Sequence, residues 1–209
     1  WKDVGEHFSL SITSLGMGEN IVAVFPYSEI SQTKQFVFVT KEGMIKRTQM
    51  KEFDVWRTYK SRPTLCIKLK TDTDEIIAAD LIEENSHKDV LLVTNMAFGL
   101  YYDLDEVPVV GARAAGVKSI NLKADDFVVD GLILDRGEDV TITIVTQRGS
   151  IKRMKVSELS KLGRAKRGLM VLRELKSNPH RVFSVVKNQD NKMIHIVAEN
   201  NNDCLFSGK

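Results

Sequence analysis

The sequence has little of what marks a reaction centre, a metal site or a membrane protein. Its four histidines are scattered among 209 residues without the spacing of metal ligands. No apolar run approaches the roughly 20 residues that a membrane-spanning helix needs. The lone Gly16-Met17-Gly18 lacks the third glycine and the following helix of a dinucleotide site, and no phosphate-binding loop is present. We find no grouping of Ser, His and Asp and no paired carboxylates in a recognisable setting. We therefore expect no catalytic residue, metal or cofactor within this chain.

The bulk composition is that of an ordinary globular protein, with 43% hydrophobic and 28% charged residues. The formal net charge is only +2, so total charge alone does not indicate a polyanionic partner. The chain starts at Trp1 rather than Met, and its first residues have no signal-peptide character. We therefore expect a piece of a longer protein that works in the cytoplasm.

One unit of sequence recurs about every 52 residues. Its most visible part is an apolar run rich in β-branched and aromatic residues, which is typical of buried strands. Successive runs end 54, 52 and 52 residues apart, so the period is nearly constant. The four runs are Phe36 to Thr40, Val90 to Thr94, Ile142 to Thr146 and Ile194 to Ala198.

A tight turn and a returning strand follow these runs. In the first unit the turn Lys41-Glu42-Gly43 ends in the glycine that hairpins favour, and the third unit repeats this arrangement. In the middle unit, Asn95 to Gly99 predicts a turn that is one residue longer. Tyr101-Tyr102-Asp103 would then stand where the other units have a Lys-Arg pair, at Lys46-Arg47 and Lys152-Arg153.

Each unit holds about four short strands, and this number predicts the fold. A single sheet of this size cannot bury its apolar face alone, so neighbouring sheets must stack. Four-stranded blades around an axis meet this need. We therefore predict one all-β, propeller-like domain over residues 1–209. Its blade repeats lie near 26–80, 81–132 and 133–186, with partial blades at 1–25 and 187–209.

Basic residues concentrate in the hairpin and the following loop of two units, within residues 41–70 and 147–176. Equivalent positions of successive blades share a surface, so these residues would form a curved positive band. Such a band neutralises DNA phosphates without reading sequence, and its curvature favours bent DNA. The alternative is that they are solubility residues that protect strand edges. The predicted DNA-binding residues are Lys41, Lys46, Arg47, Lys60, Arg62, Arg113, Lys118, Arg148, Lys152, Arg153, Lys155, Arg164, Lys166 and Arg167.

The recurring pattern of a strand, Thr-x-x-Gly and Ile-Lys-Arg resembles the C-terminal domain of the A subunits of bacterial type IIA topoisomerases, DNA gyrase and topoisomerase IV. The segments Val90 to Leu134 and Thr146 to Arg153 carry the likeness most clearly. The resemblance implies a β-pinwheel, which is a propeller relative whose blades exchange strands. It also implies a domain that binds and bends double-stranded DNA along its outer edge.

The resemblance further implies properties of a parent enzyme. That enzyme would decatenate and relax DNA using Mg²⁺ and ATP, with its catalytic tyrosine and its ATPase outside this chain. The implied partners are the ATPase B subunit and the rest of a homodimeric A subunit. The implied location is the cytoplasm, in association with the nucleoid.

One absence separates the two branches of the family. Gyrase A subunits carry a basic box of the form Gln-Arg-Arg-Gly-Gly-Lys-Gly in the first blade, and no such string occurs here. This absence favours topoisomerase IV, with the DNA-wrapping domain of gyrase as the alternative. A protein-interaction propeller is the alternative of another class, and salt-dependent DNA binding would discriminate between the classes.

Overall fold

A computed structural model describes residues 4, 15–16, 18–26, 33–53, 64–173, 177–189, 192–197 and 203–207. The described part is built from antiparallel strands joined by turns and short 3₁₀ helices. The chain divides into two compact units, which are residues 1–86 with 107–119, and residues 87–106 with 120–209. No helix in the described ranges is long and apolar enough to cross a membrane.

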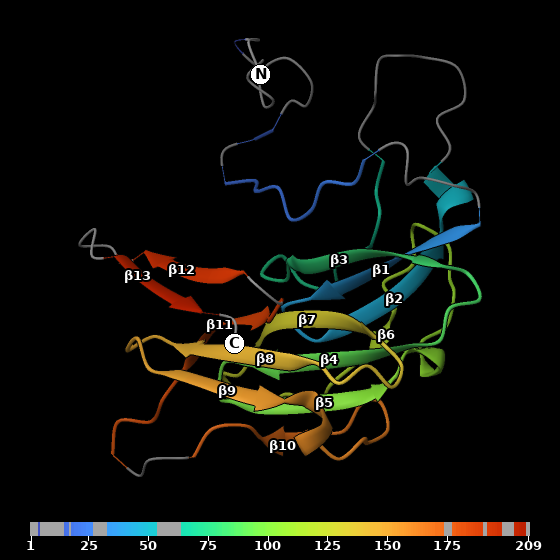
Figure 1. Cartoon of the computed structure of the whole chain (residues 1–209). Coiled ribbons are helices and arrows are strands. Elements are labelled where there is room, and N and C mark those ends of the chain that lie inside the picture. The colour runs from blue at the N-terminus through green and yellow to red at the C-terminus, as the bar shows by residue number, and fades with distance from the viewer. Residues whose placement is uncertain are drawn as a thin grey trace. The chain divides into compact units, whose positions relative to one another are not determined.

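The first unit contains one four-stranded sheet in the order β3-β1-β2-β6 (Figure 1). Its central strand β1 is buried on both faces, because the consecutive residues Val37 and Phe38 point to opposite sides and are 1% and 7% exposed. The 3₁₀ helix η2 follows the hairpin and places Phe53 against Phe36 and Phe38. The elements are β1 (Lys34–Thr40), β2 (Met44–Gln49), η2 (Met50–Phe53), β3 (Ile76–Glu83) and β6 (Val117–Lys118).

The second unit repeats this plan in a sheet of order β10-β5-β4-β7. It adds a three-stranded sheet, β11-β8-β9, and the hairpin β12-β13. These elements are β4 (Lys88–Thr94), β5 (Phe98–Asp103), η3 (Leu104–Glu106), β7 (Val128–Asp135), β8 (Thr141–Thr146), β9 (Ile151–Lys155), η4 (Val156–Glu158), β10 (Leu169–Met170), β11 (Val182–Lys187), β12 (Met193–Val197) and β13 (Asp203–Ser207).

Each four-stranded sheet takes its last strand from the following repeat. Strand β6 pairs with β2, through Met44 opposite Lys118. Strand β10 pairs with β5 in the same way, through Gly99 opposite Leu169. This exchange of strands is the feature that defines a β-pinwheel, and the predicted all-β fold with four-stranded blades is confirmed.

The hairpin turns correct one prediction. The turn of the middle repeat is not longer, because β4 ends at Thr94 and β5 begins at Phe98, as β1 ends at Thr40 and β2 begins at Met44. Ala97 adopts a left-handed φ of 63°, the conformation that Gly43 supplies with a φ of 80°. Because the residue in this conformation is not glycine, the sequence did not show that Ala97 is equivalent to Gly43.

The corrected register moves the middle repeat by one position. Lys46 stands opposite Phe38, Leu100 opposite Leu92, and Lys152 opposite Ile144. Leu100 and Tyr101 therefore occupy the places of the Lys-Arg pairs, and the assignment of Tyr101-Tyr102-Asp103 to those places was wrong.

Most of the predicted partial blade 1–25 lies outside the described residues. The predicted partial blade 187–209 contains the β12-β13 hairpin. The blade boundaries near 26–80, 81–132 and 133–186 stay a prediction.

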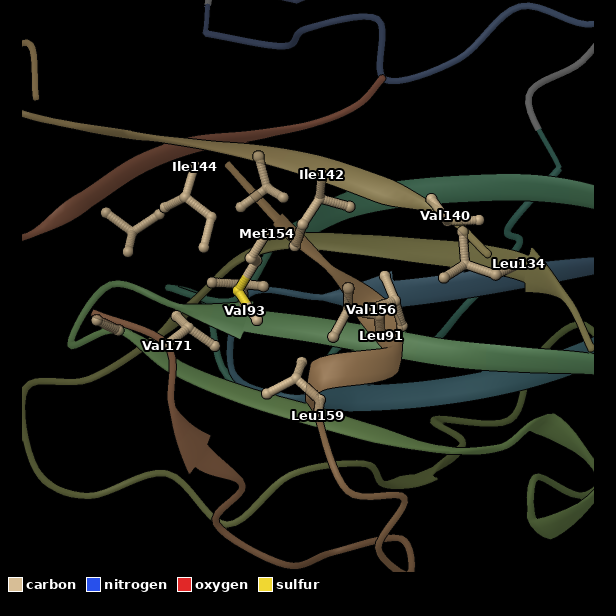
Figure 2. Close-up of a cluster of buried hydrophobic side chains, with 13 residues drawn as sticks. Leu91, Val93, Leu134, Val140, Ile142, Ile144, Met154, Val156, Leu159 and Val171 are labelled. Carbon is tan, nitrogen blue, oxygen red and sulfur yellow. The ribbon is translucent and has the colours of Figure 1, made fainter. Parts of the chain in front are cut away.

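The core of the second unit lies between its two larger sheets (Figure 2). Leu91 and Val93 of β4 and Ile142 and Ile144 of β8 are each at most 1% exposed. Val171, which follows the exchanged strand β10, packs into the same cluster. Burying side chains of this size stabilises the fold by roughly 1.5–3 kcal/mol each, so strand exchange contributes directly to the core.

Two glycines allow the exchanged strands to approach the preceding hairpin. Gly116 has a φ of +81°, and a Cβ there would lie 2.4 Å from the carbonyl oxygen of Ile45. Gly168 has a φ of +89°, and its Cβ would lie 2.4 Å from the carbonyl oxygen of Gly99. Both positions therefore require glycine for conformation and for space.

Candidate nucleic-acid interface

The predicted DNA-binding residues fall into three groups. Lys60 and Arg62 lie outside the described residues. Lys41, Arg47, Arg164 and Arg167 are half-buried, and Lys46 is fully buried. The exposed group is Arg113, Lys118, Arg148, Lys152, Arg153, Lys155 and Lys166.

Lys46 is buried because the loop before β6 covers it. Its ammonium donates hydrogen bonds to the carbonyl oxygens of Gly111, Ala112 and Ala114 at 3.0, 2.8 and 3.2 Å. Burial lowers the pKa of this ammonium, and the charges of Cys66 and Glu52 oppose that effect. Lys46 thus attaches the exchanged segment to β2, and we remove it from the proposed DNA contacts.

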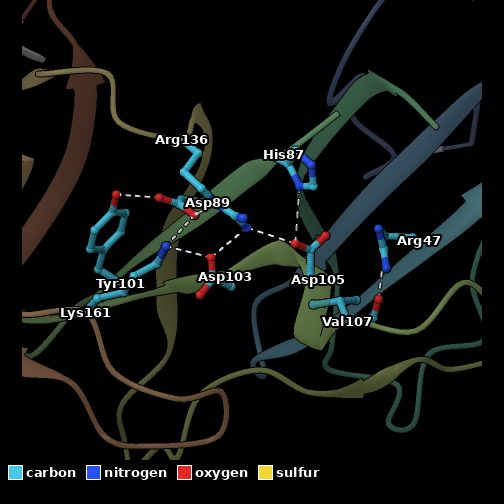
Figure 3. Close-up of polar contacts among 9 residues, drawn as sticks. All are labelled: Arg47, His87, Asp89, Tyr101, Asp103, Asp105, Val107, Arg136 and Lys161. Atoms are coloured by element: carbon cyan, nitrogen blue, oxygen red, sulfur yellow. Dashed lines mark hydrogen bonds and ion pairs between the residues drawn. The ribbon is translucent and has the colours of Figure 1, made fainter. Parts of the chain in front are cut away.

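Two further residues of the first unit have intramolecular partners. Arg47 donates from Nε to the carbonyl oxygen of Val107 at 2.7 Å (Figure 3). Lys41 pairs with Glu75 at 2.9 Å. These contacts weaken the case for both residues as phosphate ligands, because a DNA contact would have to compete with them.

Strand β9 and the turn before it present the densest exposed charge of the second unit. Arg148 lies in the turn, and Lys152, Arg153 and Lys155 follow on the strand. Lys152 donates to the carbonyl oxygen of Val171 at 2.7 Å, and Lys155 pairs with Asp139 at 2.6 Å. Arg148 and Arg153 make no ion pair within the described part of the chain. These four predicted residues therefore share one short segment, in which Lys152 lies on one face of β9 and Arg153 and Lys155 on the other.

The loop before β10 contains a second set of predicted DNA-binding residues. Its start is held by Glu106, which accepts a hydrogen bond from the Arg164 backbone N–H at 2.8 Å. Arg167 lies over the Phe98 ring, with its guanidinium carbon 3.9 Å from the ring centroid. Lys166 stays exposed, while its carbonyl oxygen accepts from the Asn121 N–H.

Sequence reasoning missed a charged network centred on Asp89 (Figure 3). Asp89 is 1% exposed and accepts hydrogen bonds from Tyr101 at 2.6 Å and from Lys161 at 2.8 Å. Arg136 approaches Asp89 at 3.4 Å and also pairs with Asp103 and Asp105. The network neutralises Lys161 and Arg136, so neither is available to DNA as an isolated cation.

The network shifts the pKa values of two of its members. Burial tends to raise the pKa of Asp89, but hydrogen bonds from Lys161 and Tyr101 and the Lys161 charge together hold it below its usual range. Burial and the hydrogen bond to Asp89 raise the pKa of Tyr101 to about 12. The only sign of this network in the sequence was Tyr101, which stands at a position that is basic in the other repeats.

We expect Tyr101 to stabilise the fold only while it is protonated. Its folded pKa of about 12 exceeds its ordinary value of 10.0, so this stability is fully present below pH 10 and is lost as pH rises towards 12. The difference in unfolding free energy between the wild type and Tyr101→Phe should therefore shrink across that interval. An ultraviolet phenolate signal that disappears in Tyr101→Phe and has its midpoint near pH 10 would contradict this assignment.

No three His, Cys, Asp or Glu side chains of the described residues come together in a way that could hold a metal ion. The polar groups that the structure gathers are chiefly Lys and Arg, together with the carboxylates that pair with some of them. Such groups bind anions through charge and hydrogen bonds.

Comparison with known proteins supports the fold and its repeat. The family model of the DNA gyrase C-terminal domain, a β-propeller, matches residues 34–83, 88–135 and 141–188. The A subunit of DNA topoisomerase 4 from Streptococcus pneumoniae is 46% identical over 183 residues, covering 88% of this chain and 22% of that protein. Its counterpart from Bacillus subtilis is 45% identical over 185 residues, with the same two coverages. The chain thus spans about a fifth of the length of these relatives.

Solved structures agree. A crystal structure of the C-terminal domain of DNA topoisomerase IV matches with a TM-score of 0.89 at 38% identity, covering all of this chain and 62% of that one. A structure of the DNA gyrase A C-terminal domain matches with a TM-score of 0.78 at 19% identity, covering 99% of this chain and 66% of that one, which supports the fold alone. The repeat, the strand exchange and the family model lead to one conclusion: the chain belongs to the DNA gyrase C-terminal domain family of β-propellers.

Proposed function

We propose that this chain binds and bends double-stranded DNA through its backbone phosphates, without reading base sequence. The observation that carries the proposal is the group of exposed Lys and Arg side chains in the second unit. Arg148, Arg153 and Lys166 have no acidic partner among the described residues, whereas Lys88 and Lys187 pair with Asp135 and Glu138. Cations without a carboxylate partner are the ones that can release counterions from DNA.

We propose further that the parent protein is the A subunit of a topoisomerase IV. The support is the likeness to the A subunits of topoisomerase 4. In that setting the domain would steer DNA for an enzyme that decatenates and relaxes DNA with ATP and Mg²⁺. Its partners would be the B subunit and the rest of a dimeric A subunit, in the bacterial cytoplasm at the nucleoid.

The proposal is tested by measuring DNA affinity against salt, with fluorescence anisotropy of a labelled duplex. We expect similar affinity for unrelated sequences, and a log-log slope against salt of about −0.9 for each phosphate contacted. End-to-end energy transfer across the same duplex should report bending. A chain that does not bind DNA even at low salt would favour the protein-interaction propeller instead.

A matched pair of double variants locates the contacts. Arg148→Gln with Arg153→Gln should make the salt slope shallower by about 1.8, which corresponds to two phosphate contacts. Lys88→Gln with Lys187→Gln removes the same net charge from ion-paired positions and should leave the slope unchanged. Equal effects of the two pairs would show that net charge, rather than a located surface, governs binding.

A further inference from the structure

A basic hollow lies at the turn end of the second unit. It has a volume of about 240 Å³ and opens beside Met96 to Phe98, the turn between β4 and β5. No Asp or Glu is among the described residues that line it. A second hollow of about 190 Å³ shares Arg173 and His180 with the first and adds Lys152. The basic side chains of the first hollow are Lys123, Arg167, Arg173, His180 and Arg181.

Two side chains that line this hollow each have a buried nitrogen atom without a hydrogen-bond partner among the described residues. The two atoms are Nη1 of Arg167 and Nδ1 of His180. The Arg167 guanidinium lies over the Phe98 ring, while its Nη1 has no hydrogen-bond partner among the described residues. An unpaired buried donor costs free energy, so Nη1 of Arg167 would gain from an acceptor, which the described residues do not supply.

The first two repeats have an aspartate at the position that His180 occupies in the third repeat. Pairing places Ile76 opposite Thr40, Val128 opposite Thr94 and Val182 opposite Thr146. The residues two positions before these partners are therefore equivalent, and they are Asp74, Asp126 and His180.

In the first two repeats this residue is an anion that serves the hairpin turn. Asp74 accepts from the Glu42 N–H at 2.9 Å, and Asp126 accepts from the Met96 N–H at 3.0 Å. In the third repeat His180 stands in the same place, and Arg167 and Arg173 line the same hollow. The third repeat thus has a cluster of donors where the others have their own carboxylate.

We propose that this hollow is a phosphate-binding site that engages one backbone phosphate of DNA. The assignment of the phosphate to DNA rests on the proposed function, whereas the donor cluster would bind any phosphate oxygen. Arg167 would supply oriented guanidinium donors, and Lys123, Arg173 and Arg181 would supply positive charge.

The sharpest test introduces a carboxylate into the hollow by substitution. His180→Asp restores the residue that the other repeats carry, so it is expected to fold, and it places a carboxylate among the basic side chains that line the hollow. We expect DNA affinity to fall roughly tenfold, as for the loss of one charged hydrogen bond, and the salt slope to become shallower by about 0.9. Gln189→Glu is the control, because Gln189 is exposed and the substitution adds the same charge in the same unit.

A second variant, Arg167→Gln, and a second probe, pyrophosphate, test the site independently of DNA binding. Pyrophosphate should bind the wild type in calorimetry and bind Arg167→Gln and His180→Asp more weakly, whether or not the chain binds DNA. Pyrophosphate binding that is unchanged in both variants would overturn the site. If the variants lose pyrophosphate but bind DNA with the wild-type salt slope, the assignment of the phosphate to DNA is overturned. If the wild type binds pyrophosphate but no DNA, the proposed function fails and the donor cluster stands.

Discussion

Gly168→Ala is expected to lower the free energy of unfolding by about 3 kcal/mol, which is a large share of the stability of a domain of this size. A left-handed φ of +89° costs an alanine about 1–2 kcal/mol. The remaining cost arises because the new Cβ would lie 2.4 Å from the carbonyl oxygen of Gly99. That oxygen belongs to β5, whose Gly99 pairs with Leu169 of β10, so the backbone cannot move without loosening the exchanged strand. Urea unfolding monitored by circular dichroism measures the change.

Gly137→Ala is the matched control for this prediction. Gly137 has a similar φ of +81°, but nothing lies within 4 Å of its Cβ position. It should therefore cost only the conformational penalty of about 1–2 kcal/mol. Equal losses in the two variants would mean that the close approach between repeats does not matter. Gly116→Ala should behave like Gly168→Ala in the first unit, because its Cβ would meet the Ile45 carbonyl oxygen at the same 2.4 Å.

Lys46→Met is expected to destabilise the first unit by about 3 kcal/mol and to leave the salt dependence of DNA binding unchanged. Methionine keeps an apolar stem in the buried site but leaves the carbonyl oxygens of Gly111, Ala112 and Ala114 without their donor. Losing charged hydrogen bonds to buried acceptors costs about 1–3 kcal/mol for each group left unsatisfied. Thermal unfolding and the salt slope, measured on one preparation, separate the structural role from a phosphate contact.

Lys51→Met is the control for Lys46, because Lys51 is exposed on η2 close to the end of β2. It removes the same charge and should change stability by less than about 0.5 kcal/mol. The opposite pattern, with intact stability in Lys46→Met and a salt slope shallower by about 0.9, would return Lys46 to the DNA-contacting set.

The strands were predictable because their signals are local. The runs that became β1, β4 and β8 are apolar and β-branched, and glycine marks two of the three hairpin turns at Gly43 and Gly149. The length of the middle turn was predicted wrongly because Ala97 adopts a left-handed φ without being glycine. That single exception displaced the comparison of Tyr101 with the Lys-Arg pairs by one residue.

The sequence by itself determined the period, the all-β class and the family, because each depends on patterns within about 50 residues that recur along the chain. Only the tertiary structure decided which cations are available to DNA. Lys46 is occupied by hydrogen bonds to carbonyl groups 65 to 68 residues away, and Lys161 is paired with Asp89, 72 residues away. Arg167 and His180 meet in one hollow because β10 joins the sheet of the preceding repeat. Charge is visible in the sequence, but its burial and its partners are set by contacts between repeats, and those contacts exist only after the strands have exchanged.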